Sequence, residues 1–259
     1  MKIENNNEHW EALADDWDNR MGDNGNDFHQ NLIRPATLRL LSPNPNERIL
    51  DIACGNGIFA RFLAEKNVDV VAFDFSPNMI ENAKKRFSDT KNIAFHVADA
   101  TDYNQLISLA EGRLFDKAVS NMAVMGIPDI KPLFKAVYEL LKIGGVFVFS
   151  ALHPCFETPD HCFTEDGTGL ITKNYIKPQN TLQVILADNP KSAVHWHRPL
   201  QELLGVCFEV GFVLDGFEEP TFAHGQCKHS VWESVPLPVV MRVRKIGICK
   251  RISYDGNNS

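Results

Sequence analysis

The stretch of sequence that decides the fold is RILDIACGNGIFARFLAEK, residues 48–66. Residues 48–52 form an apolar strand pattern and residues 58–66 a helical one, and the turn between them contains Gly55 and Gly57. Glycines let the chain turn tightly and let its backbone approach a ligand without a side-chain clash. The free amides at the start of the following helix would point at whatever occupies the turn. The stretch therefore predicts a strand, a ligand-binding turn and a helix.

The same alternation continues after this stretch. Apolar strand patterns at 68–73, 93–97, 115–119 and 146–150 are separated by helical patterns at 77–87, 103–110 and 130–141, and 212–217 and 239–243 resemble a closing pair of strands. The strand patterns show no clean two-residue alternation of apolar and polar residues, which is typical of a mostly parallel sheet buried on both faces. Right-handed crossovers make such a sheet doubly wound. We therefore predict an α/β fold with a Rossmann-like, doubly wound, mostly parallel seven-stranded sheet.

Composition narrows the class of protein. The 259 residues are 44% hydrophobic, which provides a sizeable core and excludes a chain that is disordered throughout. With 26 basic and 33 acidic residues the net charge is -7, which argues against a nucleic-acid partner. The six cysteines form no CxxC pair, the first residues contain no apolar leader, and no apolar run is long enough for a membrane span. These features predict a cytoplasmic protein with reduced thiols and no membrane partner.

Acidic residues stand at the ends of three successive predicted strands. They are Asp51, Asp74 and Asp99, and a doubly wound sheet brings these strand ends to one crevice. A pyrophosphate is disfavoured next to a carboxylate, whereas a ligand with an ammonium group, a ribose diol and an adenine fits three acids. Asp51 could hold the ammonium group, Asp74 both ribose hydroxyls, and Asp99 the adenine amino group, while the Ala100 amide donates to the ring. That ligand is S-adenosylmethionine.

This part of the chain also resembles the class I S-adenosylmethionine-dependent methyltransferases of the small-molecule type. The matching segments are ILDIACGNGIFARFLAE, VVAFDFSPNMIENAKKR, IAFHVADATD, FDKAVSNMAVM and VYELLKIGGVFVFS, in the order of the family and within residues 48–150. The resemblance implies the fold, the cofactor and a methyl-transfer activity. One departure is Ala53, which stands where many members have the first glycine.

The glycine turn, the three acids and the resemblance together predict a cofactor site. Its members are Asp51, Ala53, Gly55, Gly57, Asp74, Phe75, Met79, Asp99, Ala100 and Asn121. The resemblance implies that Met79 lies near the ribose and adenine and that Asn121 lies beside the methionine portion. A glycine pair alone also fits a relaxed dinucleotide pattern, so a nicotinamide enzyme is the alternative. The acids at 51 and 99 favour the methyltransferase.

Three parts are expected along the chain. Residues 1–47 form an N-terminal helical lid, residues 48–249 the class I methyltransferase domain, and residues 250–259 a polar tail. Residues 153–198 interrupt the alternation with prolines and glycines, which predicts an insertion after strand 5. We expect Trp17 and His29 of the lid to bind the acceptor, since a lid that excludes water strengthens electrostatic interactions inside the site.

Methyl transfer is an in-line displacement, so much of its acceleration comes from positioning. An oxygen acceptor with a high pKa also needs a base, and histidine titrates near neutral pH. His153, just after the fifth strand, and His197, just before the late helix, are the candidate catalytic residues. Arg198 could pair with a carboxylate or phenolate of the acceptor. The alternatives are structural histidines and a surface charge at the start of a helix.

The kind of acceptor is narrowed by exclusion. Residues 120–123, SNMA, lack the Asn/Asp-Pro-Pro-Tyr/Phe type of motif with which amino-methylating DNA enzymes hold a flipped base. Cys155 follows a proline as in cytosine-C5 enzymes, but no second motif supports that function. With the acidic charge, this favours a small-molecule acceptor methylated at oxygen or nitrogen. RNA methylation and a non-catalytic S-adenosylmethionine-binding protein stay open as alternatives. No metal is expected, because the His and Cys spacings are not those of zinc sites.

Overall fold

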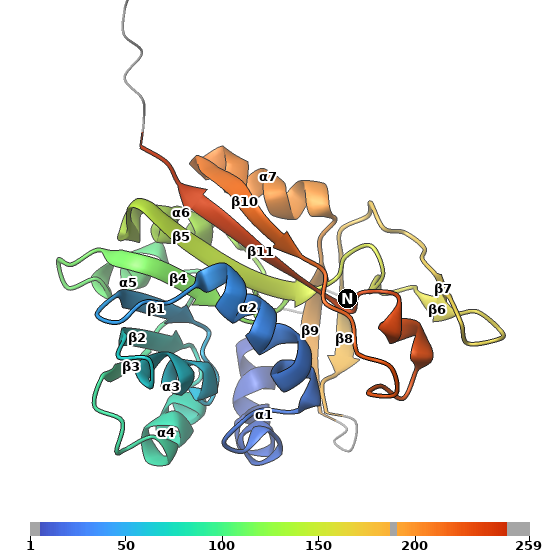
Figure 1. Ribbon diagram of the computed structural model, residues 1–259, viewed down its shortest axis with the longest axis horizontal. Coiled ribbons are helices and arrows are strands. Elements are labelled where there is room, and N and C mark those ends of the chain that lie inside the picture. The colour runs from blue at the N-terminus through green and yellow to red at the C-terminus, as the bar shows by residue number, and fades with distance from the viewer. Residues whose placement is uncertain (1–5, 187–190, 248–259) are drawn as a thin grey trace, which may run out of the picture.

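The computed structural model describes residues 6–186 and 191–247, and a seven-stranded sheet forms its centre. The strand order is β10-β11-β5-β4-β1-β2-β3 (Figure 1). Five strands are parallel: β1 (Arg48–Ile52), β2 (Asp69–Asp74), β3 (Ile93–Val97), β4 (Phe115–Ser120) and β5 (Leu141–Leu152). Strand β11 (Pro238–Lys245) is antiparallel to both β5 and β10 (Phe212–Glu218). The predicted mostly parallel, doubly wound sheet is confirmed.

Helices cover both faces of the sheet because neighbouring strand residues point to opposite sides. In β1, Ile49 packs into a cluster with Ala36 and Leu63, whereas Leu50 packs into another with Phe134. The first face is covered by α2 (Arg34–Leu41), α3 (Ile58–Ala64) and α4 (Pro77–Arg86), and the second by α5 (Tyr103–Ser108), α6 (Lys131–Leu140) and α7 (Leu200–Val210) (Figure 1). The lack of a two-residue alternation in the strand sequences follows from this double burial.

Local signals in the sequence set where the crossover helices begin. The Ser76 hydroxyl accepts a hydrogen bond of 3.0 Å from the Met79 amide at the start of α4, and Pro77 occupies the first turn. The Asp102 carboxylate accepts from the amides of Asn104 and Gln105 at the start of α5. Both caps satisfy amides that have no partner inside the helix. They fix the helices that follow the acidic ends of β2 and β3.

Strand β5 begins earlier than predicted. The helix before it ends at Leu140 rather than at 141, and Leu141 already pairs with Phe115 of β4. The register then shifts, since Lys117 pairs with Val146. Gly144, at a φ of +84°, lies in the bulge that results. Residues 142–145 have the composition of a turn, so the sequence pattern did not reveal that the strand already begins before the bulge.

The N-terminal segment lies across the carboxyl end of the sheet. Helix α1 (Asn6–Met21) packs against α4 and β9, and the π-helix η1 (His29–Ile33) continues directly into α2. Arg86 of α4 pairs with Asp18 at 2.6 Å and with Asp23 at 2.5 Å. These ion pairs and the apolar contacts of Leu13 and Trp17 with the insertion hold α1 over the edge of the sheet.

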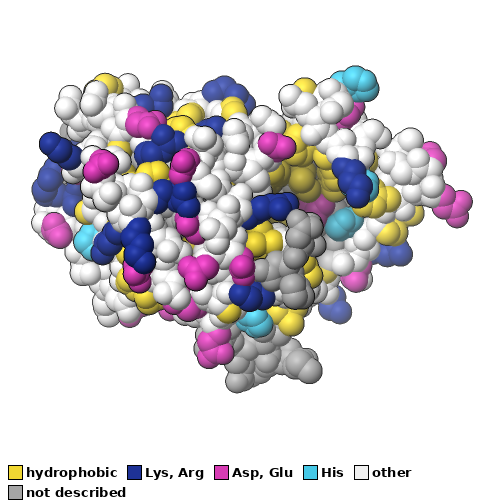
Figure 2. Space-filling view, turned by 90° about the horizontal axis from the view of Figure 1, so that it is seen from below, with side chains coloured by type: hydrophobic (Ala, Val, Ile, Leu, Met, Phe, Trp, Pro, Cys, Tyr) yellow, Lys and Arg dark blue, Asp and Glu magenta, His cyan; other side chains and the backbone are white. Residues whose placement is uncertain are grey.

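The insertion after β5 consists of two small hairpins. They are β6 (Cys162–Phe163) with β7 (Leu170–Ile171), and β8 (Gln179–Val184) with β9 (Ser192–His197). Two short helices, η2 (Val124–Gly126) and η3 (Ser230–Glu233), complete the description. On the side of the molecule where the hairpins lie, a view from below shows a hollow lined with hydrophobic side chains (Figure 2). The division into lid, domain and tail stays a prediction, and the tail at 250–259 lies outside the described residues.

Substituting Gly57 tests the packing of the turn after β1. A Cβ at Gly57, whose φ is +79°, would lie 2.8 Å from the Phe95 ring, whereas one at Gly112, with a φ of +76°, meets nothing within 4 Å. Gly112→Ala should cost about 1 kcal/mol of unfolding free energy, from backbone strain alone. Gly57→Ala should cost about 1–3 kcal/mol more, from overpacking. Urea denaturation measures both, and equal losses would contradict the close packing of this turn.

Candidate active site

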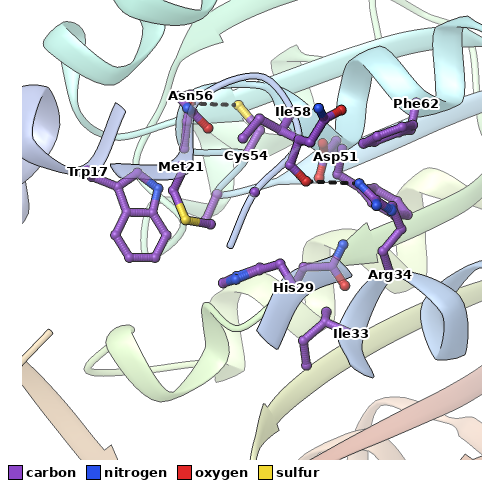
Figure 3. Close-up of a pocket in the computed structure, with 16 residues that line it drawn as sticks. Trp17, Met21, His29, Ile33, Arg34, Asp51, Cys54, Asn56, Ile58 and Phe62 are labelled. Carbon is purple, nitrogen blue, oxygen red and sulfur yellow. Dashed lines mark hydrogen bonds between the residues drawn. The ribbon is translucent and has the colours of Figure 1, made fainter. Parts of the chain in front are cut away.

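A cavity of about 630 Å³, open to solvent, lies at the carboxyl ends of β1 and β4. One wall is the segment after β1, and the other comes from α1, η1 and the start of α2. Figure 3 shows Trp17 and Arg34 at opposite ends of the cavity, with His29 and Ile33 across from Cys54 and Ile58. Of the predicted site residues, Trp17, His29, Asp51, Ala53, Gly55 and Asn121 line it.

The turn after β1 exposes its backbone to this cavity. Ala53 and Gly55 both have positive φ angles, of +51° and +54°. The Cys54 amide donates to the Phe73 carbonyl at 2.9 Å, and the Gly57 amide donates to the Cys54 carbonyl at 3.0 Å. An alanine in this conformation costs about 1–2 kcal/mol relative to its usual geometry. Such strain is often found at functional sites, where the surrounding structure maintains it.

Asp51 supplies a buried carboxyl group with an unused oxygen. It is 2% exposed, and its Oδ2 atom has no hydrogen-bond partner among the described residues. Burial, and then the charge of Asp74, raise the pKa of Asp51 to about 8. A cation would offset both effects, so this carboxyl group fits the ammonium group of S-adenosylmethionine.

Asp74 lies at the end of the neighbouring strand and holds the turn after β1. Its Oδ2 atom accepts from the Gly55 amide at 2.9 Å, and its Oδ1 atom accepts from the Ser76 amide at 3.0 Å. Burial raises the pKa of Asp74 to about 6, although these backbone hydrogen bonds act in the opposite direction. Ser76 also contacts the Glu11 carboxylate of α1 through its hydroxyl. Helix α1 therefore reaches the strand end predicted to bind the ribose.

The residues predicted for the adenosine end lie outside the cavity lining. Asp74 ends β2 and Phe75 follows it, Met79 lies in α4, Asp99 and Ala100 follow β3, and Gly57 precedes α3 without lining the cavity. The Asp99 carboxylate accepts from the amide and the hydroxyl of Thr101, both at 2.8 Å. The cavity thus brings together residues predicted for the amino-acid end of the cofactor and residues of α1, η1 and α2.

Asn121 is oriented by a residue that the sequence reasoning missed. Its Oδ1 atom accepts from the Thr37 hydroxyl of α2 at 2.8 Å, and its Nδ2 atom is buried with no partner among the described residues. The amide group is therefore a free donor at the cavity wall. Thr37 is one turn after the π-helix, and no local motif marks it.

His29 has a defined protonation pattern. The Asn26 side-chain oxygen accepts from the His29 backbone amide at 3.0 Å and lies 2.7 Å from His29 Nδ1. Since that atom accepts a backbone N–H, it is the amide oxygen, and Nδ1 must donate the second bond. Nε2 is then the unprotonated nitrogen. Burial, and then the charge of Arg34, lower the pKa of His29 to about 4, so the ring is neutral at pH 7.

The two histidines predicted to be catalytic are engaged elsewhere. His153 Nδ1 accepts from the Cys155 amide at 3.2 Å, so its Nε2 donates to the Glu219 carboxylate at 2.9 Å. His197 Nε2 donates to the Tyr175 carbonyl at 2.7 Å. His153 lines neither cavity, and His197 lines a second, smaller one of about 300 Å³ near η2 and β9. His153 and His197 therefore do not line the cavity that Trp17 and His29 line.

Arg198 also lies in the smaller cavity, with His195 and His197. Its guanidinium donates to the carbonyls of Val124, Ile127 and Pro128 at 3.1, 2.6 and 2.7 Å. The side chain is 9% exposed. Because its donors hold the η2 segment, Arg198 is engaged as a structural residue rather than turned toward the main cavity. The helix-start position in the sequence did not indicate this burial.

In the part of the chain that the structure describes, no cluster of three or more His, Cys, Asp or Glu side chains has an arrangement that could hold a metal ion. None of the helices found there has the length and apolar character needed to cross a membrane.

A doubly wound sheet of this order, with a glycine-containing turn after β1 and carboxylates at the ends of β1 and β2, defines the class I S-adenosylmethionine-dependent methyltransferase fold. Residues 49–145 match a family model described as a methyltransferase domain. The matched segment, residues 49–145, is therefore similar to S-adenosylmethionine-dependent methyltransferase domains, whose cofactor is S-adenosylmethionine.

Similar proteins agree with this assignment. A demethylmenaquinone methyltransferase of Beutenbergia cavernae is 31% identical, over 62% of this chain and 61% of that protein. A malonyl-[acyl-carrier protein] O-methyltransferase of Ilyobacter polytropus is 35% identical, over 50% and 47%. The chain thus matches less than two thirds of either relative. A solved S-adenosylmethionine-dependent methyltransferase from Mesorhizobium loti superposes with a TM-score of 0.68 at 25% identity, over 81% of this chain and 96% of that one.

The raised pKa of Asp51 predicts how stability depends on pH. The folded state binds this proton more tightly than the unfolded chain, so the resulting stabilisation is complete below about pH 4 and is lost as the pH rises through 8. Asp51→Asn removes the ionisation. We expect the ligand-free variant to melt at least about 3 °C higher than the unsubstituted protein at pH 8.5 and within about 1 °C of it at pH 4.

Thermal melts across this pH range check the prediction, with Asp89→Asn as the control because Asp89 is exposed. A variant whose melting temperature follows that of the unsubstituted protein at every pH would show that Asp51 is not the buried titrating group.

Proposed function

We propose that the protein is an S-adenosylmethionine-dependent methyltransferase that transfers a methyl group to an oxygen or nitrogen of a small-molecule acceptor. The observation that carries this proposal is the cavity at the carboxyl ends of β1 and β4. It places the unpaired Asp51 carboxyl group and the glycine turn opposite a neutral histidine, His29. A cofactor site and a proton acceptor thus share one cavity.

The walls of the cavity and the relatives support a small acceptor. Trp17, Met21, Ile33, Phe59 and Phe62 provide apolar surface, as is usual for sites that bind small molecules. One similar protein is named as a demethylmenaquinone methyltransferase and another as an O-methyltransferase. Neither name refers to a nucleic acid, and the net charge of -7 favours the same choice.

In the proposed mechanism, residues of the chain bind the cofactor, orient the reacting groups and accept a proton. S-adenosylmethionine, when bound, would supply a methyl group on its sulfonium sulfur for attack from the side opposite that sulfur. Asp51 would hold the ammonium group, and Asp74 the ribose hydroxyls. Asn121 offers a free amide donor at the wall, held by Thr37. His29 Nε2 would accept the hydrogen bond, and then the proton, of the attacking group.

This assignment replaces His153 and His197 as proton acceptors. The His29 ring is fixed by Asn26, and it packs edge-on against Trp17 with ring centres 6.0 Å apart. A low pKa makes His29 a weak base in the free protein. The proton of an oxygen or nitrogen becomes strongly acidic once that atom begins to bond to the methyl group, so a weak base in the right position is sufficient.

The proposed function can be tested by supplying the purified protein with methyl-labelled S-adenosylmethionine and a fractionated metabolite extract. The expected result is label in a small-molecule fraction, unaffected by ribonuclease treatment of the extract. Label that disappears after ribonuclease would indicate an RNA substrate. Binding of S-adenosylhomocysteine without transfer to any fraction would indicate a non-catalytic binding protein.

His29→Phe is expected to reduce the rate of transfer to the identified acceptor by about 10²–10⁴-fold, because it keeps the ring and removes the proton acceptor. Affinity for S-adenosylhomocysteine should stay within about twofold, since the turn after β1 is untouched. Initial rates with labelled cofactor measure the effect, and His153→Gln is the control because His153 lines neither cavity. A His29→Phe variant as fast as the unsubstituted protein would disprove this role.

A further inference from the structure

Arg34 is a cation in the main cavity without an anionic partner. It lines the cavity at the end opposite Trp17 (Figure 3). One of its guanidinium nitrogens donates to the Asn24 carbonyl at 2.9 Å, and the Cζ atom lies 4.0 Å from the centre of the Phe62 ring. No ion pair with Arg34 is found among residues 6–186 and 191–247. Its remaining donors are available to a ligand.

Arg61 provides a comparison on the same aromatic ring. Its Cζ atom lies 4.1 Å from the centre of Phe62, but it pairs with Glu65 at 2.5 Å and does not line the cavity. Burial, and then the charge of Arg61, lower the pKa of Arg34. Both guanidinium groups therefore pack on the Phe62 ring, and the one that faces the cavity, Arg34, has no carboxylate partner among the described residues. An anion bound at Arg34 would relieve the repulsion between them.

The charges of the cavity define which ligand group fits there. Asp51 suits an ammonium group, but a cofactor with an amino-acid end also brings a carboxylate. Placed near the carboxyl groups of Asp51 and Asp74 with no cation, that carboxylate would be repelled. Of the cavity-lining residues in the described part of the chain, Arg34 alone is positively charged at neutral pH, since His29 is neutral.

We propose that Arg34 binds the carboxylate of the cofactor's amino-acid end while Asp51 binds its ammonium group. The planar guanidinium presents two parallel N–H groups, which match the two oxygens of a carboxylate. The inference rests on the proposed function, since it assumes that this cavity holds S-adenosylmethionine. It assigns to a lid residue a part in cofactor binding that the sequence reasoning gave only to the sheet edge.

Two ligands that differ in the amino-acid end test the proposal. S-adenosylhomocysteine has this end, and 5′-methylthioadenosine lacks it but keeps the adenosine and the sulfur. Titration calorimetry on the full chain should show that Arg34→Gln lowers the affinity for S-adenosylhomocysteine by about tenfold or more. The affinity for 5′-methylthioadenosine should change by less than about twofold. Arg34→Lys should lie between the two, because it keeps the charge and loses the fork.

Two control variants separate local damage from a lost contact. Arg61→Gln removes the other cation on Phe62 and should leave both affinities within about twofold of the unsubstituted protein. Asp74→Ala should weaken both ligands to the same degree, by about tenfold or more, because both contain the ribose diol. Equal losses for both ligands in Arg34→Gln, or no loss for either, would overturn the proposal. If the unsubstituted protein binds S-adenosylhomocysteine, the proposed function survives such a result; if it binds neither ligand, both proposals fail.

Discussion

Asp51 and Asp74 place two carboxyl groups at the ends of adjacent parallel strands, both almost fully buried. The register makes this unavoidable: Ile52 of β1 lies opposite Phe73 of β2, so the strands end side by side. Two backbone amides donate hydrogen bonds to Asp74, but one oxygen of Asp51 has no partner among the described residues. Burying such groups lowers the stability of the ligand-free protein, and a bound cation reverses the loss. A cationic ligand bound at this edge of the sheet would therefore stabilise the folded protein.

The N-terminal segment provides the groups that the edge of the sheet lacks. The π-helix η1 is central to this, because the Arg34 amide donates to the His29 carbonyl five residues earlier. A π-turn advances more slowly around the helix axis than an α-turn, so residues five apart come onto the same face. Residues 29 and 34 therefore both reach the cavity, as a proton acceptor and a cation. Asn6 ties the start of α1 to the rest by donating to the Gly126 carbonyl at 2.6 Å and accepting from the Val194 amide at 2.9 Å.

Local patterns were sufficient to predict the sheet and the residues of the turn after β1. Apolar runs, glycines and acids at strand ends act over a few residues, so they are visible in one sequence. The protonation of His29 and the position of Arg34 were not visible, because they depend on Asn26 and on a π-turn that no composition marks. The hydrogen-bond partners of His153 and His197 were not visible for a related reason. Closeness to a strand end in sequence does not show which way a side chain points, and the partners Glu219 and Tyr175 come from distant segments.

The proposed site also restricts the order of events at the acceptor. The Nδ1–H of His29 is committed to Asn26, and protonation of Nε2 is opposed by burial and by Arg34. An acceptor whose proton must leave before attack would need a stronger base than this ring. An acceptor that attacks while it still holds its proton needs only a hydrogen-bond acceptor, because the proton is released easily once the new bond forms.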